Sequence, residues 1–298
     1  MSSAAVEKAL ELIQENRPDA IDHALALLQN TVYSFSMKVC GHPEDAEDTM
    51  QEVLLKLLPY LPKFENPQAL SVWLYKVARN RCLMNRRGAK KARNRHVSLD
   101  ELMPSELELE ELLKSTGPNP ELNVLRDEAG KRLREALLKV PPLYRMVLVL
   151  HDMEGLSTSE VARVIGIREG AVRVRLHRAR LLLRQELTRR EKAKRGVVDR
   201  IHAAAGEDLT KRPRNCREMF AALSDYMDGL VDDEHTREME NHLNDCKPCV
   251  AFLDSLMSAV EQCRTYQPSC DIESATKPRK VLVEKYQAAV AALPKARA

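Results

Sequence analysis

The sequence contains little glycine, only ten residues in a chain of 298. Patterns that alternate apolar and polar residues are almost absent, whereas apolar residues recur at helical spacing almost throughout. No apolar run approaches the roughly 20 residues that a membrane-spanning helix needs. No secretory signal peptide is recognisable at the N-terminus. We therefore predict an all-α protein that stays in the cytoplasm and has no membrane partner.

The patterns expected of most enzymes are missing as well. The sequence has no glycine-rich loop that would bind phosphate, and no nucleophile with a matching base. The net charge of +3 is too small to indicate nucleic-acid binding by itself. Its distribution is more informative, because basic stretches at 79–95 and 168–195 flank an acidic one at 100–111. We expect a non-catalytic protein with separately charged parts.

Residues 156–183 have the pattern of a helix-turn-helix. Ser157 and Glu160 form a capping box that would begin the first helix, and Gly166 would end it. The second helix has one apolar stripe, formed by Val172, Leu176, Ala179 and Leu183. Its other faces are rich in arginine, which favours insertion into the major groove of DNA. The alternative is an ordinary surface helix with a solvated charged face.

The cysteine pattern in the C-terminal third is typical of a metal site. His242 lies four residues before Cys246 and therefore shares its helix face, and Cys246 and Cys249 form a C-x-x-C turn. With Cys216 these residues give a closed Cys3His set, which is the arrangement that structural zinc prefers. His235 is a competing ligand, because it lies only seven residues before His242.

The total number of cysteines is seven, which is odd. Free thiols in a chain without a leader indicate a reducing cytoplasm and not a disulfide framework. Cys263 and Cys270 fall outside the metal pattern. They remain spare thiols, additional metal ligands or partners in a redox exchange.

Three separate segments carry a resemblance to a known family. Residues 43–53 resemble the polymerase-binding helix of extracytoplasmic-function (ECF) sigma factors, and residues 72–80 resemble their promoter-melting segment. The helix-turn-helix is similar to their second promoter-reading domain. The resemblance covers about residues 10–187. It implies a factor that recruits core RNA polymerase to specific promoters and initiates transcription. A stand-alone repressor or activator is the alternative, but it has no use for a polymerase-docking helix.

The resemblance also implies roles for particular side chains. Polymerase would bind one polar face of the 44–58 helix, formed by Asp45, Asp48, Gln51 and Glu52. Promoter DNA would be contacted by Glu65, Asn66, Gln68, Arg79, Asn80, Arg86, Arg87, Arg168, Arg173, His177 and Arg178. Trp73 is expected in the core. Ala171 and Val174 depart from the residues that the family usually has, so the promoter sequence cannot be carried over.

The Cys3His unit resembles the zinc-binding anti-sigma domain, whose pattern is His-x3-Cys-x2-Cys preceded by a further ligand. We expect two helical sigma domains with a flexible linker and a small helical zinc domain, divided as follows: region 2 at 10–90, linker at 91–120, region 4 at 121–187, basic connector at 188–215, zinc domain at 216–264 and tail at 265–298. An intramolecular contact between the zinc domain and the sigma domains would allow regulation in cis. Whether it inhibits or activates, and whether the zinc is structural or sensing, stays open.

Overall fold

A computed structural model describes residues 2–15, 17–85, 98–103, 125–194 and 214–266, together with Glu284 and Ala288. Within these residues every regular element is a helix, which confirms the all-α prediction. Among the helices so described, none has the length and apolarity to cross a membrane. Most of the predicted linker and of the predicted tail lies outside the described residues.

The chain forms two compact units, each of which combines segments that are distant in the sequence. Unit 1 consists of residues 1–92, 149–169 and 267–298. Unit 2 consists of residues 93–148 and 170–266. The predicted division into domains follows the order of the sequence and stays a prediction.

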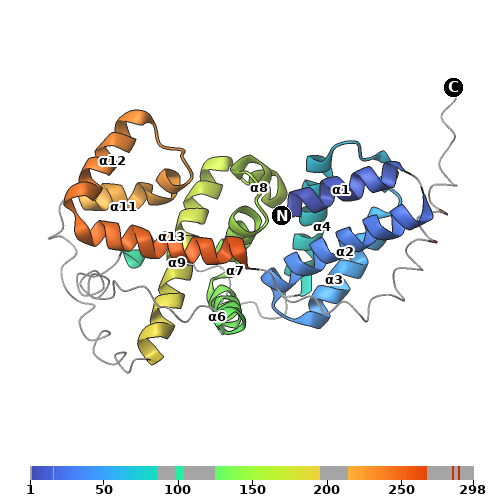
Figure 1. Ribbon diagram of the computed structural model, residues 1–298, viewed down its shortest axis with the longest axis horizontal. Helices are drawn as coiled ribbons and strands as arrows, with labels where there is room; N and C mark the ends of the chain where they lie inside the picture. Colours follow the sequence, from blue (N-terminus) through green and yellow to red (C-terminus); the bar gives the residue numbers. More distant parts are fainter. Residues whose placement is uncertain are drawn as a thin grey trace. The chain divides into compact units, whose positions relative to one another are not determined.

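Four helices make up most of the described part of unit 1: α1 (Ser2–Gln14), α2 (Pro18–Cys40), α3 (Pro43–Leu57) and α4 (Pro67–Asn85). They pack against one another around a shared core (Figure 1). Proline in the first turn begins α2 and α3, where its missing N–H costs no helical hydrogen bond. Gly41 ends α2 with a φ of 82°, a left-handed conformation that glycine adopts without strain. The fully buried core includes Leu25, Leu28, Phe35, Leu54, Leu57, Leu70 and Leu74.

Unit 1 also contains a π-helical turn (Val149–Met153) and α8 (Thr158–Ile165). The N–H of Glu154 donates to the carbonyl of Val149 over 2.9 Å, and Gly155 then has a φ of 76°. The predicted capping box is confirmed, because the side chains of Ser157 and Glu160 each accept a hydrogen bond from the other's backbone N–H. A left-handed Gly166 ends α8, as the sequence indicates.

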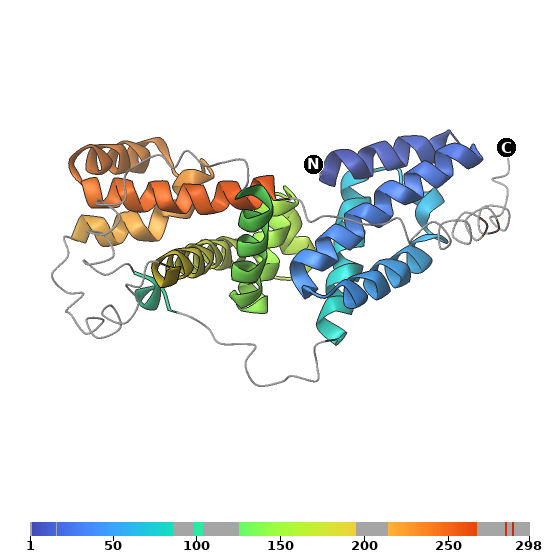
Figure 2. The same ribbon diagram turned by 60° about the horizontal axis from the view of Figure 1, so that its bottom comes forward.

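Unit 2 is built from α6 (Leu125–Lys139), α7 (Pro142–Leu148), α9 (Glu169–Lys194), α11 (Arg214–Met227), α12 (Asp233–Asp245) and α13 (Lys247–Thr265), with a short 3-10 turn at Asp100–Leu102. Helix α9 begins with the last residue of unit 1 and runs on into the predicted basic connector. The break between α6 and α7 is stabilised by Arg145, whose guanidinium donates to the carbonyls of Leu138 and Val140. Helices α11, α12 and α13 pack against one another (Figure 2).

Candidate metal centre and nucleic-acid interface

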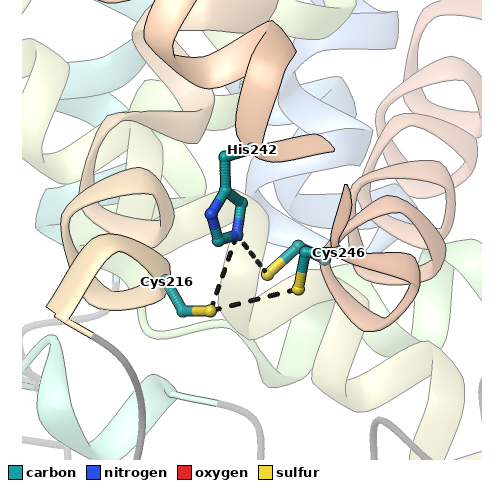
Figure 3. Close-up of side chains that lie close together, drawn as sticks. Cys216, His242 and Cys246 are labelled. Atoms are coloured by element: carbon teal, nitrogen blue, oxygen red, sulfur yellow. Dashed lines mark hydrogen bonds between the residues drawn. The ribbon is translucent and has the colours of Figure 1, made fainter. Parts of the chain in front are cut away.

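Four possible metal ligands converge in unit 2. Figure 3 shows Cys216 of α11, His242 of α12 and Cys246 pointing toward one another. With Cys249 of α13, their donor atoms all lie within 4.8 Å of one another. The Sγ of Cys216 is 3.5 Å from Nε2 of His242 and 4.0 Å from Sγ of Cys246. Nε2 of His242 is 3.4 Å from Sγ of Cys249.

The turn between α12 and α13 positions three of these side chains. Cys246 is at once the C-cap of α12 and the N-cap of α13. Its N–H donates to the carbonyl of His242 over 2.9 Å, and its carbonyl accepts from the N–H of Cys249 over 3.0 Å. Pro248 lies in the first turn of α13, where proline fits. Two hydrogen bonds thus fold the C-x-x-C segment back beside His242.

The geometry and chemistry of the cluster fit a tetrahedral zinc ion. With Zn–S bonds of ~2.3 Å and Zn–N bonds of ~2.1 Å, ligands of one zinc ion lie ~3.6–3.8 Å apart, close to the distances found here. Burial raises the pKa of the Cys249 thiol above its usual range, and the sulfurs of Cys246 and Cys216 add to the effect. A thiolate at this position therefore needs a nearby cation, which a bound metal would supply.

His235 does not belong to the cluster. Its Nδ1 lies 2.8 Å from the carboxylate of Asp232, which is the N-cap of α12. The hydrogen bond that its ring donates to the carboxylate of Asp232 raises the pKa of the exposed His235 imidazole. Of the other two cysteines in the C-terminal third, Cys263 is buried in α13, and Cys270 lies outside the described residues. The structure therefore brings Cys216 and not His235 to the other three ligands.

The predicted DNA-reading residues around α9 differ in exposure. Arg168 and Arg173 are exposed, and so is Val174. Arg178 is half-buried, whereas His177 is buried, with only 7% of its surface exposed. The N-terminal turns of α9 are therefore accessible, and the following turn is covered.

The cover over α9 comes from α11. Nδ1 of His177 lies 2.9 Å from Oγ of Ser224, and its ring packs edge-on against Phe220 with centroids 5.8 Å apart. Arg180 is fully buried and donates two hydrogen bonds, of 2.8 and 2.9 Å, to the two carboxylate oxygens of Asp228. This bidentate pairing is the strongest polar contact that an arginine makes with a carboxylate.

A third contact follows one turn later on the same face. The guanidinium carbon of Arg184 lies 3.8 Å from the centroid of the Phe252 ring, which belongs to α13. Nε of Arg184 donates to Oγ of Ser255 over 2.5 Å. His177, Arg180 and Arg184 thus form a second stripe at spacings of three and four. Their partners are distant in the sequence, so the sequence pattern alone places both arginines on an exposed basic face.

The region-2 residues predicted to contact DNA lie on and before α4. Glu65, Asn66 and Gln68 are exposed. Oδ1 of Asn66 accepts hydrogen bonds from the N–H groups of Gln68 and Ala69, over 2.8 and 3.2 Å, and so caps α4.

Further along α4, Arg79 donates to Oδ1 of the exposed Asn80 over 3.3 Å. Arg86 and Arg87 lie outside the described residues. Trp73, expected in the core, is half-buried and lies beside Tyr60 and Phe64, with ring centroids 6.4 and 6.2 Å away.

The predicted polymerase-binding face lies on α3. Asp48 and Gln51 are exposed, and Asp45 is half-buried. Glu52 is half-buried and accepts ion pairs from Lys56 at 2.6 Å and from Arg81 of α4 at 2.8 Å. The hydrogen bond from Lys56 lowers the pKa of Glu52, and the charge of Arg81 adds to this. Glu52 is therefore partly neutralised within unit 1, and Asp48 is the accessible charge.

Three family models match the chain in the order of its predicted parts. The model for Sigma-70 region 2 matches residues 25–92. The model for Sigma-70, region 4 matches residues 130–183. A third, described as "Putative zinc-finger", matches residues 216–249, a span that begins and ends at ligands of the cluster.

Curated proteins match the chain over its sigma-like part. It is 26% identical over 182 residues to the ECF RNA polymerase sigma factor SigW of Bacillus subtilis (strain 168), a match covering 61% of this chain and 96% of that protein. It is 30% identical over 181 residues to the ECF RNA polymerase sigma-E factor of Escherichia coli (strain K12), covering 60% and 93%. A solved structure, the sigma factor RpoE in complex with the anti-sigma factor NepR from Bartonella quintana, matches with 22% identity and a TM-score of 0.38, covering 55% of this chain and 94% of that one.

The buried His177 predicts a pH dependence for unit 2. Burial lowers the pKa of His177 from 6.5 to about 4, and the charges of Arg180 and Arg178 contribute. The neutral form is thus favoured in the folded state, so its stabilisation is complete above about pH 6.5 and lost as the pH falls toward 4. Between about pH 7 and about pH 5, the wild type should lose about 2 kcal/mol more unfolding free energy than His177→Gln.

Urea unfolding of both proteins at the two pH values measures this difference. Other titrating groups, including the four ligands, are present in both proteins and cancel in the comparison. An equal loss in wild type and variant would show that His177 is not held neutral against α11.

Proposed function

Because the chain belongs to the ECF RNA polymerase sigma factors, we propose that its C-terminal unit inhibits it in cis by covering the recognition helix α9. The chain recruits RNA polymerase to specific promoters and initiates transcription, as a non-catalytic factor. We call α11, α12 and α13 the zinc module. We infer that the protein acts in the cytoplasm, where core polymerase and promoter DNA are found.

The contact between α9 and the zinc module is the observation that supports inhibition. His177 and Arg180 lie in the middle of the helix that reads promoter DNA in this family, and both are buried against α11. A guanidinium that is paired with Asp228 in two hydrogen bonds is not available to a DNA phosphate. DNA and the zinc module would therefore compete for the same stripe of α9. Because the module is on the same chain, even a weak contact acts at high effective concentration.

Zinc would control this contact through the shape of the module. The four proposed ligands, Cys216, His242, Cys246 and Cys249, come from all three helices. The partners of α9 are divided between α11, which carries Ser224, and α13, which carries Phe252 and Ser255. A zinc ion joining the helices would keep both sets of partners aligned. Loss of the metal would release them, so a structural zinc can also act as a sensor.

The exposed charges support the remaining assignments. Arg168, just before α9, and Arg173 of α9 are exposed and would reach promoter DNA by base-edge or phosphate contact. The exposed Glu65, just before α4, and Gln68, in its first turn, would capture promoter bases. On α3, Asp48 and Gln51 would meet basic side chains of the polymerase, with Asp45 and Glu52 at the edge of that contact.

The docking assignment predicts that Asp48→Lys weakens binding to core polymerase. Reversal of an exposed charge at a charged interface should raise the dissociation constant ~10-fold, mainly through slower association. Binding is measured with purified core polymerase at about physiological salt, together with transcription from a promoter that the wild type recognises. Glu7→Lys is the matched control, because Glu7 is an exposed acid on α1, outside the proposed docking face. Equal weakening by both variants would contradict a specific docking face.

Inhibition by the zinc module predicts that Asp228→Asn increases transcription. Removal of one partner of a buried ion pair costs about 3–5 kcal/mol, because it leaves the guanidinium of Arg180 without its counter-charge. The module should then leave α9, and promoter-dependent transcription with core polymerase should rise. Asp254→Asn, at an exposed position of α13, should leave transcription at the wild-type level. A fall in transcription with Asp228→Asn would indicate that the module activates.

The ligand assignment predicts one zinc per chain, lost in the double variant Cys246→Ser/Cys249→Ser. Cys263→Ser should keep its zinc, because Cys263 is buried in α13 outside the cluster. Native mass spectrometry measures the metal content, and transcription with and without peroxide tests its role. If the double variant lost zinc yet transcribed and responded as the wild type does, the metal would have no part in the inhibition.

A further inference from the structure

A buried cluster of charge in unit 1 joins two parts of the chain that lie far apart in sequence. Nζ of Lys38 is 2.7 Å from Oε1 of Glu154, and the hydroxyl of Tyr75 donates to Oε2 of Glu154 over 2.9 Å. Only 6% of the Lys38 side chain and 3% of the Glu154 side chain are exposed. Lys38 and Tyr75 lie within the segment that matches region 2, whereas Glu154 lies within the segment that matches region 4.

The backbone around Glu154 holds its carboxylate in this position. The π-helical turn ends in a hydrogen bond from the N–H of Glu154 to Val149, and Gly155 turns the chain in a left-handed conformation. Such π-turns are frequent at functional sites. The ring of Tyr75 packs edge-on against the ring of Phe35, with centroids 4.9 Å apart and an interplanar angle of 63°. Directly after Glu154, α8 packs against α4.

We propose that Lys38, Tyr75 and Glu154 form a latch that holds region 2 against the first half of region 4 and keeps the chain in a closed form. The first helix of a helix-turn-helix crosses the DNA backbone, and here it is α8 that packs on α4. Surfaces of α4 and α8 that face each other cannot contact promoter DNA. The closed form must therefore open before both regions engage a promoter on the polymerase. The latch lies wholly within unit 1 and is distinct from the contact between α9 and the zinc module.

A buried ion pair suits a contact that has to open. Removing two charges from water opposes their attraction, so such a pair adds little net stability compared with apolar side chains. When the contact opens, both charges regain their hydration, which offsets part of the lost attraction. Apolar residues at the same positions would hold the two regions together more tightly and expose an apolar patch on opening.

The test uses the full chain with Lys38→Met, Glu154→Gln and the two changes combined. Each single change leaves one charge buried without its counter-charge and should open the latch. The combined variant buries no charge and keeps an acceptor for the Tyr75 hydroxyl, so it should stay closed. Glu11→Gln, which breaks the exposed Lys8–Glu11 pair on α1, is the control.

Two measurements report the outcome. Amide hydrogen exchange of the free chain should increase in α4 and α8 for both single variants, and should stay at the wild-type rate for the combined variant and the control. The apparent affinity for core polymerase should rise for the single variants only. The gain should lie between ~10-fold and ~1,000-fold, because the open form of a closed protein is typically populated to ~0.1–10%.

The difference between the single variants and the combined variant separates a latch from damage to the fold. If the combined variant exchanged as fast as the single variants, lost packing and not lost pairing would explain the effect, and the latch would be overturned. Single variants that exchange like the control would overturn it as well. The inference rests on the proposed function only for its second measurement: if no form of the chain bound polymerase, that function would fail, and hydrogen exchange would still decide the latch.

Discussion

Buried guanidinium groups need partners, and α9 buries two of them. Arg180 meets the carboxylate of Asp228 in a bidentate pair, and Arg184 stacks on Phe252. An unpaired charge in the same place would be strongly destabilising, so the position of the zinc module and the burial of these arginines depend on each other. DNA can satisfy arginine equally well through its phosphates. Under the proposed inhibition, the recognition helix would therefore exchange the zinc module for DNA without leaving its arginines unpaired.

The proposed metal centre would control this exchange of partners on α9. Small three-helix units bury little apolar surface, and a structural zinc commonly supplies the missing free energy. In this chain the proposed ligands lie on α11 and at the turn that begins α13, and these are the two helices that contact α9. The order of the zinc module would thus depend on the metal, and the accessibility of α9 would depend on the module. Loss of zinc from the four proposed ligands would thus change how accessible α9 is to DNA.

Charged pairs in this protein differ in what their burial allows. Glu52 has two partners but remains a third exposed, so solvent screens it and its contribution to stability is small. Glu154 is almost fully buried with Lys38, so its pairing decides whether the surrounding surfaces stay together. Arg180 is fully buried against a carboxylate that is 10% exposed, at the edge of the zinc module. The burial of an ion pair, and not the number of pairs, decides whether it holds a conformation or contributes little to stability.

Features that depend on near neighbours in the chain follow from the sequence alone. Ser157 and Glu160 are three residues apart, so their capping box follows from helix geometry alone. His242, Cys246 and Cys249 are local in the same sense, and the order of the sigma-like segments could be recognised without any structure. The capping box and the His242–Cys246–Cys249 group depend on spacings of three or four residues, which a helix converts directly into contacts.

Which helix faces meet depends on the packing of segments that are distant in the sequence. Cys216 joins the cluster across 26 residues, and His235 does not, because Asp232 holds it at the start of α12. Arg180 and Asp228 are 48 residues apart, and Lys38 and Glu154 are 116 apart. An arginine stripe on a helix has the same pattern whether it faces water, DNA or a carboxylate. The partner is set by packing between distant segments, and no local pattern records it.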